Sequence, residues 1–193
     1  MTRDELLDLF RRSGGLLEGH FRLTSGLHSS GYLQCALVLQ HPQHAEALGR
    51  AIADRTRDLR PSVVLSPALG GVVIGHEVAR ALGGRALFAE RQDGALTLRR
   101  GFVIGETERV LVVEDVLTTG GSTRETMQVA KAAGGQVVGA AAIVDRSGRP
   151  GVRFDVPFAA LLEIDLPTYE PNACPLCARG LPVMKPGSRP VAT

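Results

Sequence analysis

Short apolar runs and longer apolar stripes alternate along most of the chain. Residues 63–65 and 110–113 are uninterrupted apolar runs, which are typical of strands buried on both faces of a parallel sheet. Similar runs predict three further strands, at residues 86–89, 137–144 and 158–164. Stripes with helical spacing predict helices at residues 42–59, 72–82 and 124–133. This alternation predicts an α/β fold, with an open parallel sheet, flanking helices and right-handed crossovers.

The two ends of the chain follow other patterns. A stripe of leucines predicts a short amphipathic helix at residues 3–12, and two glycines end it. Residues 16–40 are expected to be extended and rich in turns. Proline and glycine dominate from Pro167 onward, so we expect an irregular tail over residues 167–193.

Residues 92–108 form a long connection between two predicted strands. Apolar residues alternate with polar ones on both sides of Arg100 and Gly101, namely Leu96, Leu98, Phe102 and Ile104. This pattern predicts a small mobile hairpin that turns at Arg100 and Gly101.

Polar residues that could bind a ligand follow the apolar run 110–113. Glu114 and Asp115 come first, where we expect the strand to end, and a turn of Thr, Gly and Ser at residues 118–123 leads into a helix. Ligands bind beyond the carboxyl ends of such strands, and a glycine-rich turn before a helix offers backbone N–H groups to an anion. Because two carboxylates repel phosphate, the pattern suits a ligand with phosphate at one end and hydroxyls or Mg²⁺ at the other. A sugar phosphate meets both conditions.

Two simpler interpretations explain less of this segment. A helix capped by Ser122 or Thr123 accounts for the turn but leaves the paired acids unexplained. A Walker A phosphate loop is excluded, because no Gly-Lys-Ser/Thr closes the turn.

Composition limits the classes of protein that fit. The chain has 193 residues, a hydrophobic content of 44% and a mean hydropathy near zero, as expected for one globular enzyme domain. No apolar run is long enough for a membrane span, and the charged N-terminus has no apolar signal core, so we expect a cytoplasmic protein. A formal net charge of +2 gives no argument for nucleic-acid binding. We therefore expect neither a membrane nor a nucleic acid as a partner.

Residues 110–123 resemble the signature of the type I phosphoribosyltransferases, which bind 5-phosphoribosyl 1-diphosphate (PRPP). The resemblance implies that Glu114 and Asp115 hold the ribose hydroxyls and that residues 118–123 surround the 5′-phosphate. The implied PRPP-binding residues are Arg91, Glu114, Asp115, Val116, Leu117, Thr118, Thr119, Gly120, Gly121, Ser122 and Thr123, with Ala68, Leu69 and Gly70 in a pyrophosphate loop.

Three other segments resemble the orotate phosphoribosyltransferases within that family. They are residues 21–32, 66–71 and 144–146. The implied orotate-binding residues are Ser25, Gly26, Tyr32, Thr118 and Arg146. Independently of the resemblance, orotate is an anion, and a guanidinium can meet a carboxylate with two parallel hydrogen bonds. The alternative for Arg146 is a solvated arginine or a pair with Asp145.

The chain also departs from the family pattern. Lysines are usual in the family where Thr24 and Gly70 stand here, and Gln92 replaces the lysine of an Arg-Lys pair. The connection 92–108 contains no lysine or histidine. We therefore expect Arg91, Arg99 and Arg100 to stabilise the leaving diphosphate, with the last two at the hairpin tip. The alternative for Arg99 and Arg100 is a solvated turn.

The resemblance implies a reaction, a fold and partners. Orotate and PRPP would give orotidine 5′-monophosphate and diphosphate, with Mg²⁺ held mainly by PRPP and water and by no direct side-chain ligand. It implies a single phosphoribosyltransferase domain over residues 1–193, with a hood from residues 1–40, a sheet core at 41–166 and a C-terminal segment that contributes to the hood. It also implies a cis peptide near Ala68 and Leu69, and a homodimer in which residues 92–108 act as a lid over shared active sites.

Three other functions stay open from the sequence. A phosphoribosyltransferase for another nucleobase would carry the same signature. A regulator that binds PRPP on the same fold would explain why the loop lacks lysines. A structural protein without a ligand would leave the residues after Val113 unexplained.

The cysteines allow several interpretations. Cys35 lies in an apolar stretch and is expected in the core. Cys174 and Cys177 have the spacing of half a zinc site, and two such pairs across a dimer axis, or a redox disulfide, are alternatives to our expectation of reduced thiols in a local turn. The five histidines show no metal-binding spacing, so we expect no zinc; they are His20, His28, His41, His44 and His76.

Overall fold

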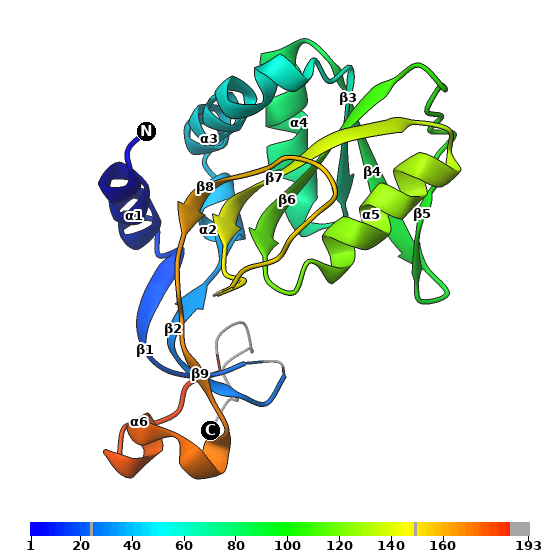
Figure 1. Cartoon of the computed structure of the whole chain (residues 1–193). Coiled ribbons are helices and arrows are strands. Elements are labelled where there is room, and N and C mark those ends of the chain that lie inside the picture. Colours follow the sequence, from blue (N-terminus) through cyan, green and yellow to red (C-terminus); the bar gives the residue numbers. More distant parts are fainter. Residues whose placement is uncertain (24, 149, 186–193) are drawn as a thin grey trace.

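The computed structural model describes residues 1–23, 25–148 and 150–185 (Figure 1). Its larger sheet has six strands in the order β5-β4-β3-β6-β7-β8. The strands are β3 (Val63–Pro67), β4 (Arg85–Gln92), β5 (Ala95–Leu98), β6 (Arg109–Leu117), β7 (Gln136–Asp145) and β8 (Phe158–Glu163). All neighbouring pairs are parallel except β4 and β5. The expected α/β class is confirmed, with one antiparallel strand added at an edge.

Helices cover both faces of this sheet because successive side chains of a strand point to opposite faces. Leu111 and Val113 of β6 pack in a cluster with α3 (Pro42–Thr56) and α4 (Gly70–Leu82). Val110 and Val112, on the other face, pack under α5 (Gly121–Ala132). All four residues are fully buried. The uninterrupted apolar run therefore marks the strand that is covered on both sides.

A second, smaller sheet joins the two ends of the chain below the main sheet in Figure 1. Its strands are β1 (Leu16–Arg22), β2 (His28–Leu33) and β9 (Thr168–Tyr169), which pair in the order β1-β2-β9. Phe21 also forms a parallel bridge with Met184. The hood of N-terminal and C-terminal segments that the resemblance implied is therefore present.

The first helix connects this sheet to the main core. α1 (Arg3–Arg12) begins with a capping box between Thr2 and Glu5, and it buries Leu6 and Phe10. Both side chains belong to the same cluster as the α3 face of the main sheet. Among the described residues, no helix is long and apolar enough to cross a membrane.

Several expected element boundaries were wrong. Residues 35–39, expected to be extended, form α2 (Cys35–Leu39), whose three buried apolar residues pack into the core in a helix too short to show a periodic stripe. The expected irregular tail contains β9, the 3₁₀ helix η2 (Pro171–Ala173) and α6 (Pro175–Ala178), while residues 186–193 lie outside the described residues. The 3₁₀ turn η1 (Arg57–Leu59) follows α3.

The expected turn at Arg100 and Gly101 is present, but the paired strands of the hairpin turn elsewhere. β4 and β5 pair with Gln92 opposite Ala95, so the turn consists of Asp93 and Gly94, both with positive φ. Such left-handed pairs connect two strands tightly, and Asp-Gly is a common sequence for them. Ile104, which had suggested a second hairpin strand, packs under α5 in a buried cluster instead.

Candidate active site

The two acids lie within β6 rather than after it. β6 pairs with β7 up to Leu117 and Asp145, so the strand continues four residues beyond the apolar run. The prediction that the strand ends at Val113 was wrong, because the backbone ladder continues where the side chains become polar. Glu114 and Asp115, as neighbours in a strand, point to opposite faces of the sheet.

Glu114 points toward the start of α5. The Thr123 hydroxyl donates a hydrogen bond to its carboxylate, and Thr123 is itself buried. Burial raises the pKa of Glu114, a rise that the Thr123 hydrogen bond opposes and the charge of Asp115 increases. A ligand that supplies positive charge or hydroxyl donors would therefore stabilise the ionised form of this carboxylate.

Asp115 faces the start of α4. A Cβ placed on Gly70 would lie 2.6 Å from Asp115 Oδ1, so only a glycine lets the helix start approach this carboxylate. Burial raises the pKa of Asp115, against hydrogen bonds from the backbone N–H groups of Val116 and of Asp115 itself. The structure thus brings together the paired acids and the segment predicted as a pyrophosphate loop.

That loop has the backbone form that the resemblance implied. The peptide bond between Ala68 and Leu69 is cis. The backbone N–H of Ala68 donates to the carbonyl of Ala89 on the neighbouring strand β4, and the Leu69 side chain is 86% exposed. The loop therefore presents its backbone at the carboxyl edge of the sheet.

The turn between β6 and α5 exposes a row of unused donors. Within the described residues, none of the backbone N–H groups at positions 118–123 donates a hydrogen bond. Gly120 precedes the helix with φ of 75°, and a Cβ there would lie 2.7 Å from Val152 Cγ1. The free N–H groups at a helix start form a binding site for an anion such as phosphate.

Arg91 lies at the base of the β4–β5 turn and is held by α5. Its guanidinium donates to both carboxylate oxygens of Glu125, at 3.1 and 2.8 Å, and to the carbonyl of Gly94 at 2.6 Å. Glu125 also accepts from the backbone N–H of Leu96 at 2.7 Å. No local pattern in the sequence indicates Glu125, because its contacts are with residues about 30 positions away.

Arg99 and Arg100 are not at a hairpin tip, contrary to expectation. They follow β5, which runs back from the turn, so the chain is leaving the carboxyl edge of the sheet. The Arg100 guanidinium donates two hydrogen bonds of 2.8 Å to Glu90 and lies 5.8 Å from the Phe88 ring centre. A tight turn does form at Arg100 and Gly101, both with positive φ, but no described strand follows it to pair with β5, so it is not the tip of a hairpin.

Arg146 follows β7 beside the acids. Its backbone N–H donates to the carbonyl of Leu117 at 2.8 Å, which fixes it next to the anion-binding turn. Its Nε is buried without a hydrogen-bond partner, and among the described residues no carboxylate pairs with it. Asp145 instead accepts from the backbone N–H of Ser147. The alternative of a pair with Asp145 is therefore not what the structure shows.

The surroundings of Arg146 come from the hood. Burial lowers the pKa of Arg146, and an interaction with Tyr32 on β2 opposes that change. Ser25 and Gly26 lie in the turn between β1 and β2, where the N–H of Gly26 donates to the carbonyl of Leu23. Thr118 is exposed at the start of the anion-binding turn, so its hydroxyl is open to a ligand.

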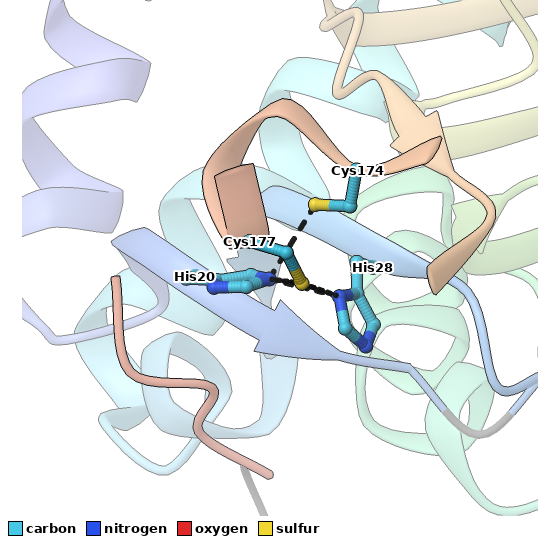
Figure 2. Close-up of side chains that lie close together, drawn as sticks. All are labelled: His20, His28, Cys174 and Cys177. Carbon is cyan, nitrogen blue, oxygen red and sulfur yellow. Dashed lines mark hydrogen bonds between the residues drawn. The ribbon is translucent and has the colours of Figure 1, made fainter. Parts of the chain in front are cut away.

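A second group of side chains lies apart from this site. His20, His28, Cys174 and Cys177 converge on one another in the hood (Figure 2). The spacing of the histidines along the sequence had not indicated this arrangement. Sequence spacing did not show it because more than 140 residues separate the histidines from the cysteines.

The chain is similar to a known protein family over most of its length. The family profile "Phosphoribosyl transferase domain" matches residues 36–158. The orotate phosphoribosyltransferase of Pelotomaculum thermopropionicum is 54% identical over 191 residues, which cover 99% of this chain and 100% of the relative. The orotate phosphoribosyltransferase of Heliobacterium modesticaldum is also 54% identical over 191 residues, 98% of this chain and 100% of the relative.

Solved structures agree with these relatives. A crystal structure of Mycobacterium tuberculosis orotate phosphoribosyltransferase with Fe(III) dicitrate has a TM-score of 0.71 and 28% identity, and the match covers 83% of this chain and 95% of that one. The same enzyme in complex with PRPP matches with a TM-score of 0.66, at the same identity and coverage.

Proposed function

The chain belongs to the orotate phosphoribosyltransferases, and from this premise we propose how its own residues carry out the reaction of that family. The reaction transfers the 5-phosphoribosyl group of PRPP to orotate and gives orotidine 5′-monophosphate and diphosphate. Membership confirms the resemblance first seen at residues 110–123. The two relatives at 54% identity support neither another nucleobase nor a regulatory role.

One observation carries the assignment of the site. A row of free backbone N–H groups, at positions 118–123, lies next to two half-buried acids at the end of the same strand. We assign the 5′-phosphate to these N–H groups and the ribose hydroxyls to Glu114 and Asp115. A hydroxyl can donate to a carboxylate, whereas a phosphate is repelled by it, so the order of the residues sets the direction of the substrate.

The acids also fit the expected Mg²⁺. Among the described residues, neither Glu114 nor Asp115 has a cationic partner, although burial raises the pKa of each. The positive charge of a cation bound through PRPP and water would favour the ionised form of both carboxylates. When bound, Mg²⁺ supplies positive charge to the diphosphate.

The protein contributes position and charge rather than a nucleophile. As the bond from C1 of the ribose to the diphosphate breaks, positive charge develops on the sugar beside Glu114 and Asp115. Negative charge develops on the diphosphate, which lies against the loop at Gly70. Donors that are already aimed at such charge need no reorganisation during the reaction. Arg91 lies near the end of β4. Its guanidinium reaches the diphosphate once it releases the Glu125 carboxylate.

Arg146 is the residue proposed to select orotate. Its buried Nε lacks an acceptor, and the orotate carboxylate can accept two parallel hydrogen bonds from a guanidinium. Tyr32 and Thr118 complete the pocket from the hood and from the turn, with Ser25 and Gly26 in the loop above it. A neutral base would leave the buried Nε unpaired, which is costly.

The test is orotate-dependent release of diphosphate from PRPP, followed as loss of orotate absorbance. Arg146→Gln should raise the KM for orotate by at least ~10-fold, since a charged hydrogen bond contributes about 1.5–3 kcal/mol, and should leave the KM for PRPP nearly unchanged. Arg50→Gln, at an exposed arginine of α3, is the matched control. Equal effects on both substrates, or turnover of uracil in place of orotate, would contradict the assignment.

A homodimer with shared active sites is a further part of the proposal, and its support is the family resemblance. Its test is to mix the variants Asp115→Asn and Arg99→Ala, because the family resemblance implies that residues 92–108 of one chain serve the active site of the other. Shared sites would restore part of the activity, whereas independent sites would restore none. A cytoplasmic location stays a prediction.

A further inference from the structure

Four potential metal ligands meet where the C-terminal segment crosses the β1–β2 hairpin (Figure 2). His20 comes from β1, His28 begins β2, and Cys174 and Cys177 lie at the start of α6 and within it. One ligand atom from each of the four lies within 4.8 Å of all the others. Three of the residues are buried, and only Cys177 is exposed.

The backbone of β1 is irregular at this point. The pairing of β1 with β2 shifts register between Glu18 and Phe21, which is a β-bulge that includes His20. Bulges re-aim a side chain out of the regular ladder and are common next to functional sites. The bulge therefore accounts for how a strand residue turns toward the cysteines.

The tautomer of His20 follows from its partners. Its Nδ1 lies 2.8 Å from the carbonyl oxygen of Leu181, and a carbonyl only accepts, so Nδ1 carries the proton. Its Nε2 therefore presents a lone pair to the centre of the cluster. A histidine that ligates a metal almost always donates its other ring N–H in this way, often to a backbone carbonyl.

Three groups converge on that single lone pair. His28 Nδ1 is 2.9 Å from His20 Nε2, Cys174 Sγ is 3.5 Å away and Cys177 Sγ is 3.8 Å away. Cys177 Sγ is also 3.3 Å from His28 Nδ1. One lone pair cannot accept good hydrogen bonds from three donors at once. A cation at the centre would instead be ligated by two thiolates and two imidazole nitrogens together.

The distances fit a tetrahedral ion. With metal–nitrogen bonds of about 2.1 Å and metal–sulfur bonds of about 2.3 Å, a tetrahedral zinc ion holds its ligand atoms roughly 3.3–3.8 Å apart. Three of the four distances above fall in this range, and the two nitrogens, at 2.9 Å, need to separate only slightly. Two sulfurs with two nitrogens in this geometry are typical of zinc.

We propose that His20, His28, Cys174 and Cys177 of one chain bind a structural Zn²⁺ ion. Two thiolates balance its charge, which allows the ion to lie among buried side chains. All four positions are filled by protein, so the site is closed to substrate and differs from a catalytic zinc site. It lies within one chain and needs no second pair of cysteines across a dimer axis.

The ion joins segments that few other contacts hold together. β9 pairs with β2 over two residues only, and Met184 exchanges two backbone hydrogen bonds with the end of β1. Zinc adds a link between residues more than 140 positions apart, and closing such a long loop restricts the unfolded chain strongly. It also clamps the hairpin whose turn holds Ser25 and Gly26.

The first test is the metal content of the full-length protein, purified without a metal-affinity tag. Elemental analysis should find about one zinc ion per chain, released when the thiols are titrated with a mercurial. A strong chelator should remove it, lower the Tm and expose the chain to trypsin at Arg179, which lies just after α6. Fewer than ~0.1 ions per chain, with no uptake of added Zn²⁺ under reducing conditions, would overturn the proposal.

Matched variants locate the ion. Cys177→Ser and His28→Asn should each lower zinc affinity at least ~10-fold, whereas Cys35→Ala and His76→Asn, which remove a cysteine and a histidine outside the cluster, should keep one ion per chain. Equal zinc content in all four variants would overturn the assignment. This readout does not involve turnover, so its failure would be separate from a failure of the proposed function.

Cobalt substitution tests the geometry even if the variants do not fold. Wild-type protein loaded with Co²⁺ should show the strong visible bands of tetrahedral cobalt and a thiolate-to-cobalt charge-transfer band in the near ultraviolet. Weak bands typical of octahedral cobalt, or a disulfide between Cys174 and Cys177 that persists when zinc is supplied under reducing conditions, would contradict the proposal.

Discussion

Glu114 and Asp115 show why individual residues of the sequence were enough to predict the site. Two acids after an apolar run are costly in a strand that is otherwise buried, and burial raises the pKa of both. Such a violation of the local pattern indicates function rather than folding. The signal was local, over residues 110–123, and so it could be recognised. The partners of these residues, such as Gly70 opposite Asp115, required the fold.

Replacing Asp115 by asparagine should separate activity from stability. Asp115→Asn should lower kcat at least ~100-fold, comparable to the loss of one preorganised group, while circular dichroism stays unchanged. Asp54→Asn, at an exposed aspartate of α3, is the control. Steady-state kinetics near the wild-type values would refute the assignment of the ribose site.

The same variant should be more stable than the wild type at neutral pH. Because burial raises the pKa of Asp115 in the folded protein, its stabilising effect is complete below the pKa of the unfolded chain and is lost as the pH rises through the folded pKa. An amide does not ionise, so the Tm advantage of Asp115→Asn should grow with pH above about 4. Thermal unfolding between acid and neutral pH measures it, and an advantage that shrinks with rising pH would contradict this reasoning.

Gly70 tests the close approach of α4 to the acid. Gly70→Ala should place a Cβ 2.6 Å from Asp115 Oδ1 and displace that carboxylate, so kcat/KM for PRPP should fall ~10-fold or more. Gly105→Ala is the control, because a Cβ there meets Glu108 at an ordinary 3.7 Å. The measurement is kinetics with PRPP varied, and an unchanged Gly70→Ala enzyme would show that this spacing is unimportant.

At the scale of elements, the β4–β5 hairpin shows where the sequence interpretation failed. The alternating residues from Leu96 to Ile104 suggested a hairpin about Arg100, and a turn does form there, but the strands that pair turn at Asp93 and Gly94. Ile104 is buried because it packs under α5, and not because it pairs in a hairpin. Alternation along a strand and burial under a helix look alike in one sequence, so only the structure separated them.

Glu125 joins this hairpin to the helix whose start forms the proposed phosphate site. Glu125→Ala should remove the acceptors of Arg91 and of the Leu96 N–H, so amide hydrogen exchange across β5 should accelerate ~10-fold or more. Exchange elsewhere in the sheet should not change. Glu106→Ala is the control, and full protection of β5 in Glu125→Ala would mean that the strand pairing alone holds the hairpin.

At the scale of the whole molecule, the parallel core was predictable and the hood contacts were not. The six-stranded sheet follows from apolar runs that each depend on near neighbours along the chain. The hood brings β9 and Met184 onto β1 and β2, across more than 130 residues. Nothing local in the proline-rich tail indicates that pairing, and the same distance concealed the cluster of histidines and cysteines.

Ser29 tests how the C-terminal segment is attached to the hood. Its buried hydroxyl donates to the carbonyl of Pro167 at 3.0 Å and accepts from the N–H of Gly31. Ser29→Ala should leave both groups unpaired and lower the free energy of unfolding by about 1–3 kcal/mol in urea. Ser30→Ala, next to it, is the control, and equal stability of the two variants would contradict a role for this hydroxyl.

The pairing of β9 with β2 has a consequence for the order in which the protein folds during synthesis. The ribosome makes the β1–β2 hairpin early, but β9 and the two cysteines of the cluster follow only after every strand of the main sheet. The main sheet can therefore assemble on a growing chain before the three-stranded hood sheet can form. The hood is the later of the two sheets to close, and the cluster of histidines and cysteines closes with it.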